Sequence, residues 1–402
     1  MGVLQGAAFA QRFAALDALL TEYQPLWRNR PFVQQRLAWE DDYPQLAVWL
    51  RSRSLQHAEE HQLEPWWLQA PEPFPQWARL TGALSATGAL PLLSVRKVPE
   101  VMQRGIPGRK WQQITAFAGC LPLHWQGSSW LDWCSGKGHL GRLLAWPDDC
   151  LCCIEQDPQL IAEGQLLSER WQLRAQHRQC DALSPAADRH LAASDSWVAL
   201  HACGDLHTSL LRKAGQQAVR RLVVAPCCYN RISANAYQPL SRPGRASALK
   251  LDRSALGLPL QATVTAGAGE VRRRNRMMAW RLAFDGLQRT WRGVDEYLPI
   301  PSKVSRWPET CFSRWCTRVA ALKQTDMQPV ADWAAAERAG WELLAQVRNL
   351  ELVQGLFRRP LELWLLCDMA LWLQEQGFEV QLGEFCSTQL TPRNLMLLAE
   401  RD

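Results

Sequence analysis

The sequence has no apolar run long enough for a membrane-spanning helix, and it has no internal repeat or low-complexity tract. Its start, Met-Gly-Val-Leu-Gln-Gly, lacks the charged segment and apolar core of a secretory signal. Gly6 stands where myristoylation needs Ser or Thr. These absences argue against a membrane protein and predict a cytoplasmic location.

Cysteines at disulfide or zinc spacing are also lacking. The 13 cysteines are odd in number, and several are adjacent within apolar runs, as at Cys152-Cys153 and Cys227-Cys228. That pattern favours free thiols in a reducing compartment. Cys311 and Cys316 are five positions apart, and no second Cys or His pair stands at ligand spacing. The sequence therefore predicts no metal site.

What is present indicates a large folded protein. At 402 residues the chain is long for one domain, and its 47% hydrophobic content supports a sizeable core. The net charge of +6 permits a polyanionic partner without demanding one. Most of the 21 tryptophans are expected in the core, with a few available as surfaces for stacking bases.

The most informative stretch runs from Ser128 to Arg142. A short apolar run, 130–133, is followed by a turn with Gly136, Gly138 and Gly141, and then by an apolar helical pattern. Strand, glycine turn and helix in this order are typical of the first crossover of a nucleotide-binding sheet. Glycines let the main chain approach a ligand, and the helix start offers unpaired N–H groups.

The next predicted strand limits the choice of ligand. The apolar run 150–154 ends at Glu155, 19 positions after Gly136. An acid at the tip of the second strand, about 20 residues on, can accept both hydroxyls of a ribose. Lys137 is followed by Gly138 rather than Ser or Thr, which argues against a phosphate loop. We therefore expect an adenosine compound, either S-adenosylmethionine or a nicotinamide dinucleotide.

Asp132 favours the first of these cofactors. A carboxylate at the mouth of the first strand would repel a pyrophosphate, whereas it would attract the ammonium and sulfonium groups of S-adenosylmethionine, directly or through water. A nicotinamide-dependent oxidoreductase stays an alternative, as does an ordinary α/β crossover whose glycines serve packing alone.

The chain divides into three parts. Residues 1–115 are predicted to be an N-terminal helical region, in which Asp41-Asp42 ahead of Pro44 signals a helix start. Residues 116–229 together with 361–402 alternate strand and helix and form the predicted catalytic domain. Residues 230–360 break this alternation and are predicted to be an insertion.

Seven strands are expected in that domain. Five alternate with helices, at 130–133, 150–154, near 179–180, 197–201 and 221–225, and two close the chain, at 378–385 and 394–400. A last strand inserted antiparallel beside the fifth is the arrangement of class I methyltransferases. The predicted fold class is therefore α/β, a Rossmann-like class I methyltransferase sheet of seven strands with the last one antiparallel.

Three motifs resemble a known family. They are Asp-x-Cys-Ser-Gly-Lys-Gly-His-Leu at 132–140, His-Ala-Cys-Gly-Asp-Leu at 201–206 and Pro-Cys-Cys-Tyr at 226–229. Together they are similar to the methyltransferase domain of "methyltransferase-like" and "ribosomal RNA adenine dimethylase domain-containing" proteins, and more distantly to a eukaryotic tRNA ribose methyltransferase. The resemblance covers 128–229, and more loosely 384–394.

The resemblance implies S-adenosylmethionine as cofactor and a set of residues around it. Gly136, Gly138 and His139 would line its methionine moiety, and Glu155 its ribose. Asp181 with Ala182 would contact the adenine. His201 and Asp205 would face the methyl group and are the candidate catalytic residues, with a buried histidine and a helix cap as the alternatives. The full predicted cofactor set is Asp132, Cys134, Ser135, Gly136, Gly138, His139, Glu155, Gln156, Asp181, Ala182, His201, Ala202 and Gly204.

The loop Pro226, Cys227, Cys228 and Tyr229 is predicted to face the substrate. It resembles the Asn-Pro-Pro-Tyr loop of amine methyltransferases, although it follows strand five rather than strand four. A nucleophilic Cys227 or Cys228, with Cys203 as second cysteine, and buried small residues are the alternatives. No lysine follows strand five, which argues against ribose 2′-O transfer by a Lys-Asp-Lys-Glu set.

The acceptor is expected to be RNA. Basic stretches at Arg242–Arg253 and Arg272–Arg276 could follow a phosphate backbone, while a charged helix face explains the second equally well. The leading hypothesis is direct in-line methyl transfer to RNA. A protein methyltransferase, and a catalytically silent protein that binds the cofactor or RNA, are the alternatives.

Overall fold

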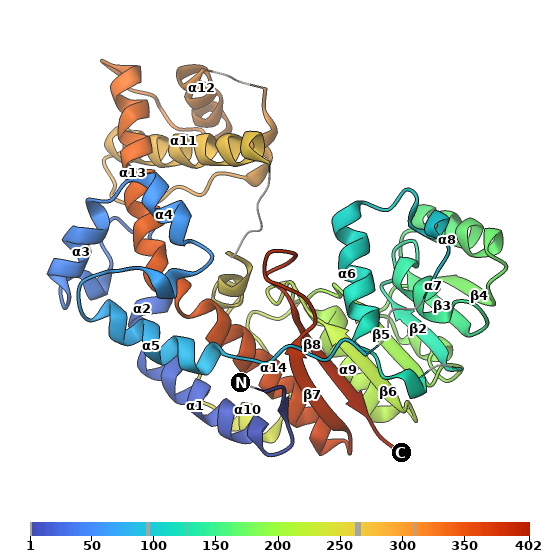
Figure 1. Cartoon of the computed structure of the whole chain (residues 1–402). Coiled ribbons are helices and arrows are strands. Elements are labelled where there is room, and N and C mark those ends of the chain that lie inside the picture. The colour runs from blue at the N-terminus through green and yellow to red at the C-terminus, as the bar shows by residue number, and fades with distance from the viewer. Residues whose placement is uncertain (1, 94–96, 126, 262–266, 309–310) are drawn as a thin grey trace. The chain divides into compact units, whose positions relative to one another are not determined.

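A computed structural model describes residues 2–93, 97–125, 127–261, 267–308 and 311–402. The chain forms two compact units, each assembled from separate segments. The sheet unit comprises Met1–Thr21, Ala83–Val264 and Arg358–Asp402, and the helical unit comprises Glu22–Gly82 and Thr265–Phe357. Figure 1 shows the elements of both units, which are described separately below.

The described residues of the sheet unit form one eight-stranded sheet in the order β1-β7-β8-β6-β5-β2-β3-β4. The strands are β1 Leu4–Gln5, β2 Ser129–Trp133, β3 Cys150–Glu155, β4 Ala175–Gln179, β5 Ser196–Leu200, β6 Arg221–Ala225, β7 Glu379–Glu384 and β8 Leu395–Glu400. Neighbours among β2 to β6 are parallel, and β8 is antiparallel to both β6 and β7. The Rossmann-like class I methyltransferase sheet is therefore confirmed.

One strand adds to the seven predicted. The two-residue β1 pairs antiparallel with β7, with Leu4 opposite Leu382 and Gln5 opposite Gln381. Periodicity cannot reveal a strand of two residues, because alternation needs at least four.

Helices cover the sheet on both faces. The helices of this unit are α1 Ala8–Glu22, α6 Gly108–Gly119, α7 His139–Ala145, α8 Pro158–Arg170, α9 Asp205–Gln216, α10 Arg242–Ala246 and α14 Arg358–Glu375. On one face Trp130 and Val198 join a core cluster with Phe117 of α6 and Leu144 of α7. On the other, Trp133 Nε1 donates to the Leu206 carbonyl of α9, at 3.0 Å. Residues of β2 therefore alternate between the two layers.

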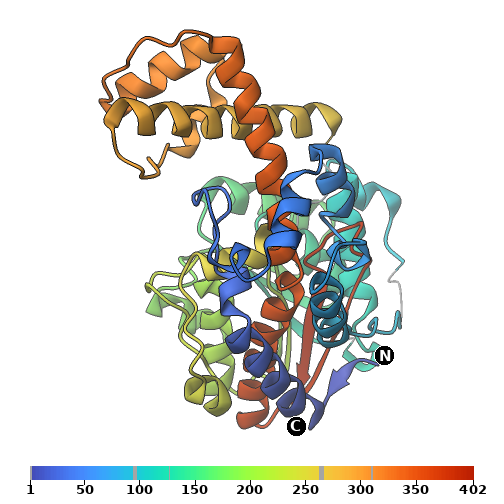
Figure 2. The same ribbon diagram turned by 90° about the vertical axis from the view of Figure 1, so that its left-hand side faces the viewer.

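The helix α14 anchors segments from distant parts of the sequence. Phe13 of α1 packs on Trp364, with ring centroids 5.1 Å apart, and the two helices lie side by side in both views (Figures 1 and 2). Asp368 of α14 is fully buried. Its carboxylate accepts hydrogen bonds from Tyr237 Oη (2.8 Å), Leu240 N (2.8 Å), and Ser241 N and Oγ (3.0 and 2.6 Å). Residues 230–261, predicted as part of the insertion, thereby belong to the sheet unit.

The helical unit joins the predicted N-terminal region to the predicted insertion. Its helices are α2 Gln24–Trp27, α3 Pro44–Arg51, α4 Leu55–His61, most of α5 Phe74–Ser85, α11 Ala268–Arg292, α12 Phe312–Lys323 and α13 Trp333–Gly355. The long helices α11 and α13 pack together, and α13 also contacts α3 and α4. Asn349 of α13 donates to the Arg53 and Ser54 carbonyls, at 3.2 and 3.1 Å. Residues 22–82 and 265–357 thus share one core.

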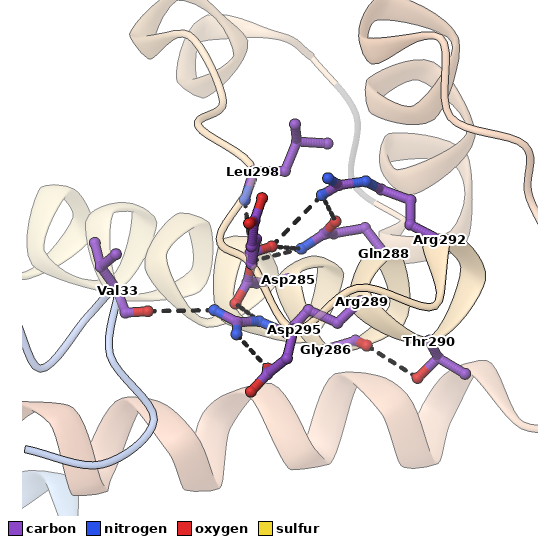
Figure 3. A network of polar contacts seen from close by, with 10 residues as sticks. Val33, Asp285, Gly286, Gln288, Arg289, Thr290, Arg292, Asp295 and Leu298 are labelled. Carbon is purple, nitrogen blue, oxygen red and sulfur yellow. Dashed lines mark hydrogen bonds and ion pairs between the residues drawn. The ribbon is translucent and has the colours of Figure 1, made fainter.

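A polar network fixes the end of α11 (Figure 3). Asp285 accepts from Gln288 Nε2 at 2.9 Å and from Arg289 Nε at 2.8 Å. Arg289 also donates to Asp295 Oδ1 at 2.5 Å and to the Val33 carbonyl at 3.2 Å. A single guanidinium therefore links the helix, the segment after it and the early part of the chain.

Within the described ranges, no helix combines the length and apolarity needed to cross a membrane.

Candidate functional site

The glycine turn lies between β2 and α7, where the order of the parallel strands reverses. Cys134, Gly136 and Gly138 all have left-handed backbones, with φ of 58°, 57° and 70°. A side chain at such an angle is strained unless its surroundings hold it, so Cys134 is an unusual residue here. The turn is closed by hydrogen bonds from Ser135 N to Ile154 O (3.0 Å) and from Gly138 N to Ser135 O (2.9 Å).

The three glycines of the turn meet different surroundings. A Cβ on Gly138 would stand 2.8 Å from His177 Cε1 and 2.9 Å from Cys153 Sγ, and one on Gly141 would stand 2.6 Å from Leu151 Cδ1. These two glycines allow the turn and α7 to pack on the sheet. At Gly136 nothing lies within 4 Å of the Cβ position. The main chain at Gly136 is therefore not covered by other residues on the side where a ligand would approach.

Glu155 lies beside this bare backbone. Its Oε2 accepts a hydrogen bond from Gly136 N at 2.9 Å, and its Oε1 accepts from Gln156 N at 2.8 Å and Asp157 N at 3.1 Å. The carboxylate is half-buried. The tip of β3 thus presents an oriented acid next to the first glycine, as the sequence predicts for a group that accepts ribose hydroxyls.

Asp132 is placed differently from its predicted position at the mouth of the site. Its side chain is 3% exposed, and its Oδ2 accepts from Gly141 N of α7 at 2.9 Å. Burial raises the pKa of Asp132 to about 7, against the opposing effects of that hydrogen bond and of Arg142. The residue is next to last in β2 and points toward α7, because only every second strand residue can face the covering helices. Its carboxylate positions the turn.

This burial predicts a pH-dependent stability. An unfolded aspartate titrates near pH 4, so between about pH 4 and pH 7 the folded protein binds the proton more tightly, and the free energy of unfolding falls as pH rises. Asp132→Asn keeps an oxygen for Gly141 N but cannot ionise. The free energy of unfolding of the variant minus that of the wild type should therefore be about 2–3 kcal/mol larger at pH 8 than at pH 5. Urea unfolding at both pH values measures this gain, and an unchanged difference would contradict it.

Arg142, which is buried, and His139, which is half-buried, form a pair in α7. Arg142 is 3% exposed, and its guanidinium donates to the Lys137 carbonyl and, at 2.7 Å, to His139 Nδ1. Burial, with Arg142 and Lys110 nearby, lowers the pKa of His139 to about 3. The imidazole is therefore neutral, with its proton on Nε2. Sequence reasoning named His139 but missed Arg142, which reads as an ordinary charged residue on a helix.

The loop after β5 brings the candidate catalytic residues to the same edge of the sheet. His201 has a left-handed backbone (φ 67°), and its Nε2 lies 2.8 Å from Gln113 Oε1. Since the amide oxygen only accepts, Nε2 donates and Nδ1 is left as an acceptor. Partial desolvation, with Lys110 and Arg393 nearby, lowers the pKa of His201. Its partner Gln113 on α6 lies far away in sequence and was not predicted.

Gly204 and Asp205 hold the next turn in place. Gly204 has φ of 56°, and a Cβ on it would stand 1.8 Å from the Arg231 carbonyl oxygen. Asp205 is the first residue of α9, and its Oδ2 accepts from Ser233 N at 2.7 Å. Ala202 is fully buried. These contacts give Asp205 a structural partner in the loop after β6, but Asp205 is not the helix cap of the alternative reading, because Gly204 holds the N-cap position of α9.

The four residues predicted to face the substrate lie at different depths in the loop after β6. Tyr229 points into the interior instead, because its ring packs on His207 and its hydroxyl donates to Glu362 Oε1 at 3.3 Å. Tyr229 is 2% exposed and Cys227 is 8% exposed. Pro226 is also buried, whereas Cys228 is half-buried.

The predicted adenine contacts lie at the tip of β4. Asp181 is exposed, and its Oδ1 accepts from Leu183 N at 2.9 Å, while Ala182 is buried. Gln156 is exposed beside Glu155. The predicted cofactor residues therefore lie near the ends of β2 and β3 and in the loops that follow β2, β3, β4 and β5, at the carboxyl edge of the parallel strands.

Comparison with known proteins identifies the domain that holds these residues. Residues 109–235 match the family model described as a methyltransferase domain. Among solved structures, the chain is similar to magnesium protoporphyrin IX methyltransferase from Synechocystis PCC 6803 with bound SAH. That similarity has 14% sequence identity and a TM-score of 0.26, and covers 42% of this chain and 70% of the other. A similarity of this size establishes neither a shared substrate nor a shared site.

The chain thus contains a methyltransferase domain and is a methyltransferase with S-adenosylmethionine as its cofactor. The residues present fit that cofactor: the backbone at Gly136 is open, and the Glu155 carboxylate lies next to it. The match to the methyltransferase-domain model does not support the more specific resemblance to ribosomal RNA adenine dimethylase domains.

Proposed function

We propose that this protein transfers the methyl group of S-adenosylmethionine to RNA by direct in-line displacement. The observation that carries the RNA assignment is a basic cavity of about 530 Å³ in the helical unit. Its lining includes Arg273, Arg274, Arg281 and Lys303, against the single acid Glu270. A cationic hollow of this kind fits a phosphate group.

The cavity combines fixed and exposed cations. Arg281 is held by donation to the Ile300 carbonyl at 2.8 Å and the Pro301 carbonyl at 2.9 Å. Arg273 and Lys303 are exposed, as is Arg272, the residue before Arg273 in α11. A held guanidinium next to exposed cations can orient a phosphate while the others neutralise its neighbours.

The other basic stretch contributes less to the proposal. Arg253 donates to the Ala234 carbonyl at 3.1 Å and the Ser233 carbonyl at 2.6 Å, and Arg245 donates to the Leu240 carbonyl. These guanidinium groups satisfy backbone carbonyls of their own unit. We therefore place the RNA contact at α11 rather than at Arg242–Arg253.

On the donor side, Glu155 would accept the ribose hydroxyls, and the backbone at Gly136 would pass beside the methionine moiety. S-adenosylmethionine supplies an electrophilic methyl group when bound. The chain's own task is to align an acceptor with it. His201 has an available Nδ1 and a lowered pKa, which keeps it uncharged at neutral pH, so it is the candidate for taking a proton from the acceptor.

The direct test is methyl transfer from labelled S-adenosylmethionine to total RNA of cells that lack this protein, followed by nucleoside mass spectrometry. Label in one modified nucleoside is the expected result. Label in protein instead would favour a protein methyltransferase. No label in either, with the cofactor bound, would favour the silent binding protein.

A charge variant tests the RNA contact separately. Arg273→Gln with Lys303→Gln should weaken RNA binding, and should reduce the slope of log K against log salt by about 1.4, since each single-strand phosphate contact contributes about 0.7. Arg79→Gln, an exposed arginine of α5 outside the cavity, is the control and should bind RNA as the wild type does. Filter binding at several salt concentrations gives both slopes. An equal slope for the double variant and the wild type would remove the cavity from the proposal.

A further inference from the structure

Three thiols from two loops meet at the carboxyl edge of the sheet. Cys203 follows β5, and Cys227 and Cys228 follow β6. The Sγ atoms of Cys203 and Cys227 are 3.1 Å apart, and those of Cys227 and Cys228 are 3.6 Å apart. All three sulfurs lie within 4.8 Å of one another, and all three residues are free cysteines.

We propose that Cys203, Cys227 and Cys228 form a binding site for one zinc ion. Thiolate sulfur is a soft ligand, which selects zinc over the hard cations magnesium and calcium. Zinc–sulfur bonds of about 2.3 Å in a tetrahedron place the sulfurs about 3.8 Å apart. Each sulfur–sulfur distance in the cluster would have to change by about 1 Å or less to reach that geometry.

The surroundings support a charged metal–thiolate group. Three thiolates and one divalent cation carry a net charge of −1, which is costly to bury without a counter-charge. Arg231, three residues after Cys228, interacts electrostatically with both Cys203 and Cys228. Its positive charge would balance the group. Cys227 is buried and would form the inner corner of the site.

The fourth coordination position is open. Within the described part of the chain, no fourth Cys, His, Asp or Glu completes the group. Structural zinc sites take four protein ligands, whereas sites that act on a bound molecule take three and leave one position free. Cys203 and Cys228 are half-buried, so solvent or another molecule can reach this side. The free position takes water or one soft donor atom, such as a thiolate or a ring nitrogen.

The cluster also lies close to the glycine turn. Cys203 interacts electrostatically with Cys134, the strained residue at the start of the turn. A zinc ion held here would therefore lie on the edge of the sheet where the predicted cofactor residues collect. The proposal stands independently of RNA as the acceptor, because it depends only on the three thiols.

Metal content tests the site without any activity measurement. The full chain, purified under reducing conditions, should contain about one zinc per molecule by plasma mass spectrometry. After zinc is removed, cobalt should bind in its place and produce a thiolate-to-cobalt charge-transfer absorption that the zinc form lacks. Cys203→Ser and Cys228→Ser should each lower zinc affinity at least tenfold. Cys150→Ser, which changes an exposed thiol on β3, is the matched control and should leave affinity unchanged.

Circular dichroism and calorimetric titration with S-adenosylmethionine should show that each variant is folded, so that lost zinc is not lost structure. Two results would overturn the proposal. One is a reduced wild-type protein that binds neither zinc nor cobalt. The other is a Cys203→Ser/Cys228→Ser double variant that binds zinc as tightly as the wild type. A cross-linked peptide that contains Cys203 and Cys227 in protein purified without reductant, together with no metal, would assign this pair to a disulfide instead.

Discussion

Glu155→Ala should lower the affinity for S-adenosylmethionine about 100-fold. A carboxylate that accepts two ribose hydroxyls makes two charge-assisted hydrogen bonds, each worth about 1.5 kcal/mol or more, and the affinity changes tenfold for every 1.4 kcal/mol. The same carboxylate holds Gly136 N, at 2.9 Å, so its loss also loosens the turn beside the cofactor. Calorimetric titration with S-adenosylmethionine measures the change.

Two further variants locate the effect. Glu155→Gln keeps the hydrogen bond from Gly136 N but loses the charge, so its affinity should lie between those of the alanine variant and the wild type. Glu169→Ala removes an exposed acid from α8, whose contact is with Gln165, and should bind the cofactor normally. If Glu155→Ala binds as tightly as the Glu169 variant, the ribose assignment is wrong.

Asp368→Ala should destabilise the sheet unit by about 3–5 kcal/mol. The fully buried carboxylate accepts four hydrogen bonds, and removing it strands the Tyr237 hydroxyl, the Ser241 hydroxyl and two backbone N–H groups in the interior. Removing one partner of a buried charged network costs this much, because the remaining polar groups lose their hydrogen-bond partner and cannot reach water to replace it. Thermal or urea unfolding measures the loss.

Asp368→Asn is the matched comparison. The amide keeps one oxygen acceptor but turns the other side into a donor that faces Ser241, so part of the stability should be lost. Glu375→Ala, on the same helix near its end, removes an exposed contact with Arg242 N and should cost about 1 kcal/mol or less. Equal stability of Asp368→Ala and Glu375→Ala would show that the network contributes little.

Local signals were enough to predict the sheet. The strand, glycine turn and helix around Gly136, the acid at the end of β3 and the closing pair β7 and β8 are all set by neighbours in sequence, through side-chain alternation and glycine spacing. The predicted boundaries at 115 and 230 do not follow the two compact units, because residues 22–82 and 265–357 pack together across a long sequence separation. A single sequence carries no signal for that pairing.

The candidate site shows the same limit at the level of side chains. The positions of Glu155 and His201 follow from the strand ends, but the sequence cannot tell which face Asp132 occupies or that Arg142 lies beneath the turn. Tyr229 stands in a loop motif, yet its partner Glu362 is on α14, so its burial depends on tertiary packing. Sequence reasoning grouped Cys203 with Cys227 and Cys228 as possible nucleophiles but not as metal ligands, since spacing along one segment cannot reveal a ligand set from two loops.

The antiparallel strand β8 has a consequence for biosynthesis. It lies between β6 and β7 in the sheet, but the ribosome makes it after the whole of the helical unit's second segment. Until β8 is made, one edge of the apolar strand β6 has no hydrogen-bonding partner, and unpaired strand edges of this kind promote association with other nascent chains. We therefore expect newly made chains to depend on chaperones until β8 has been synthesised.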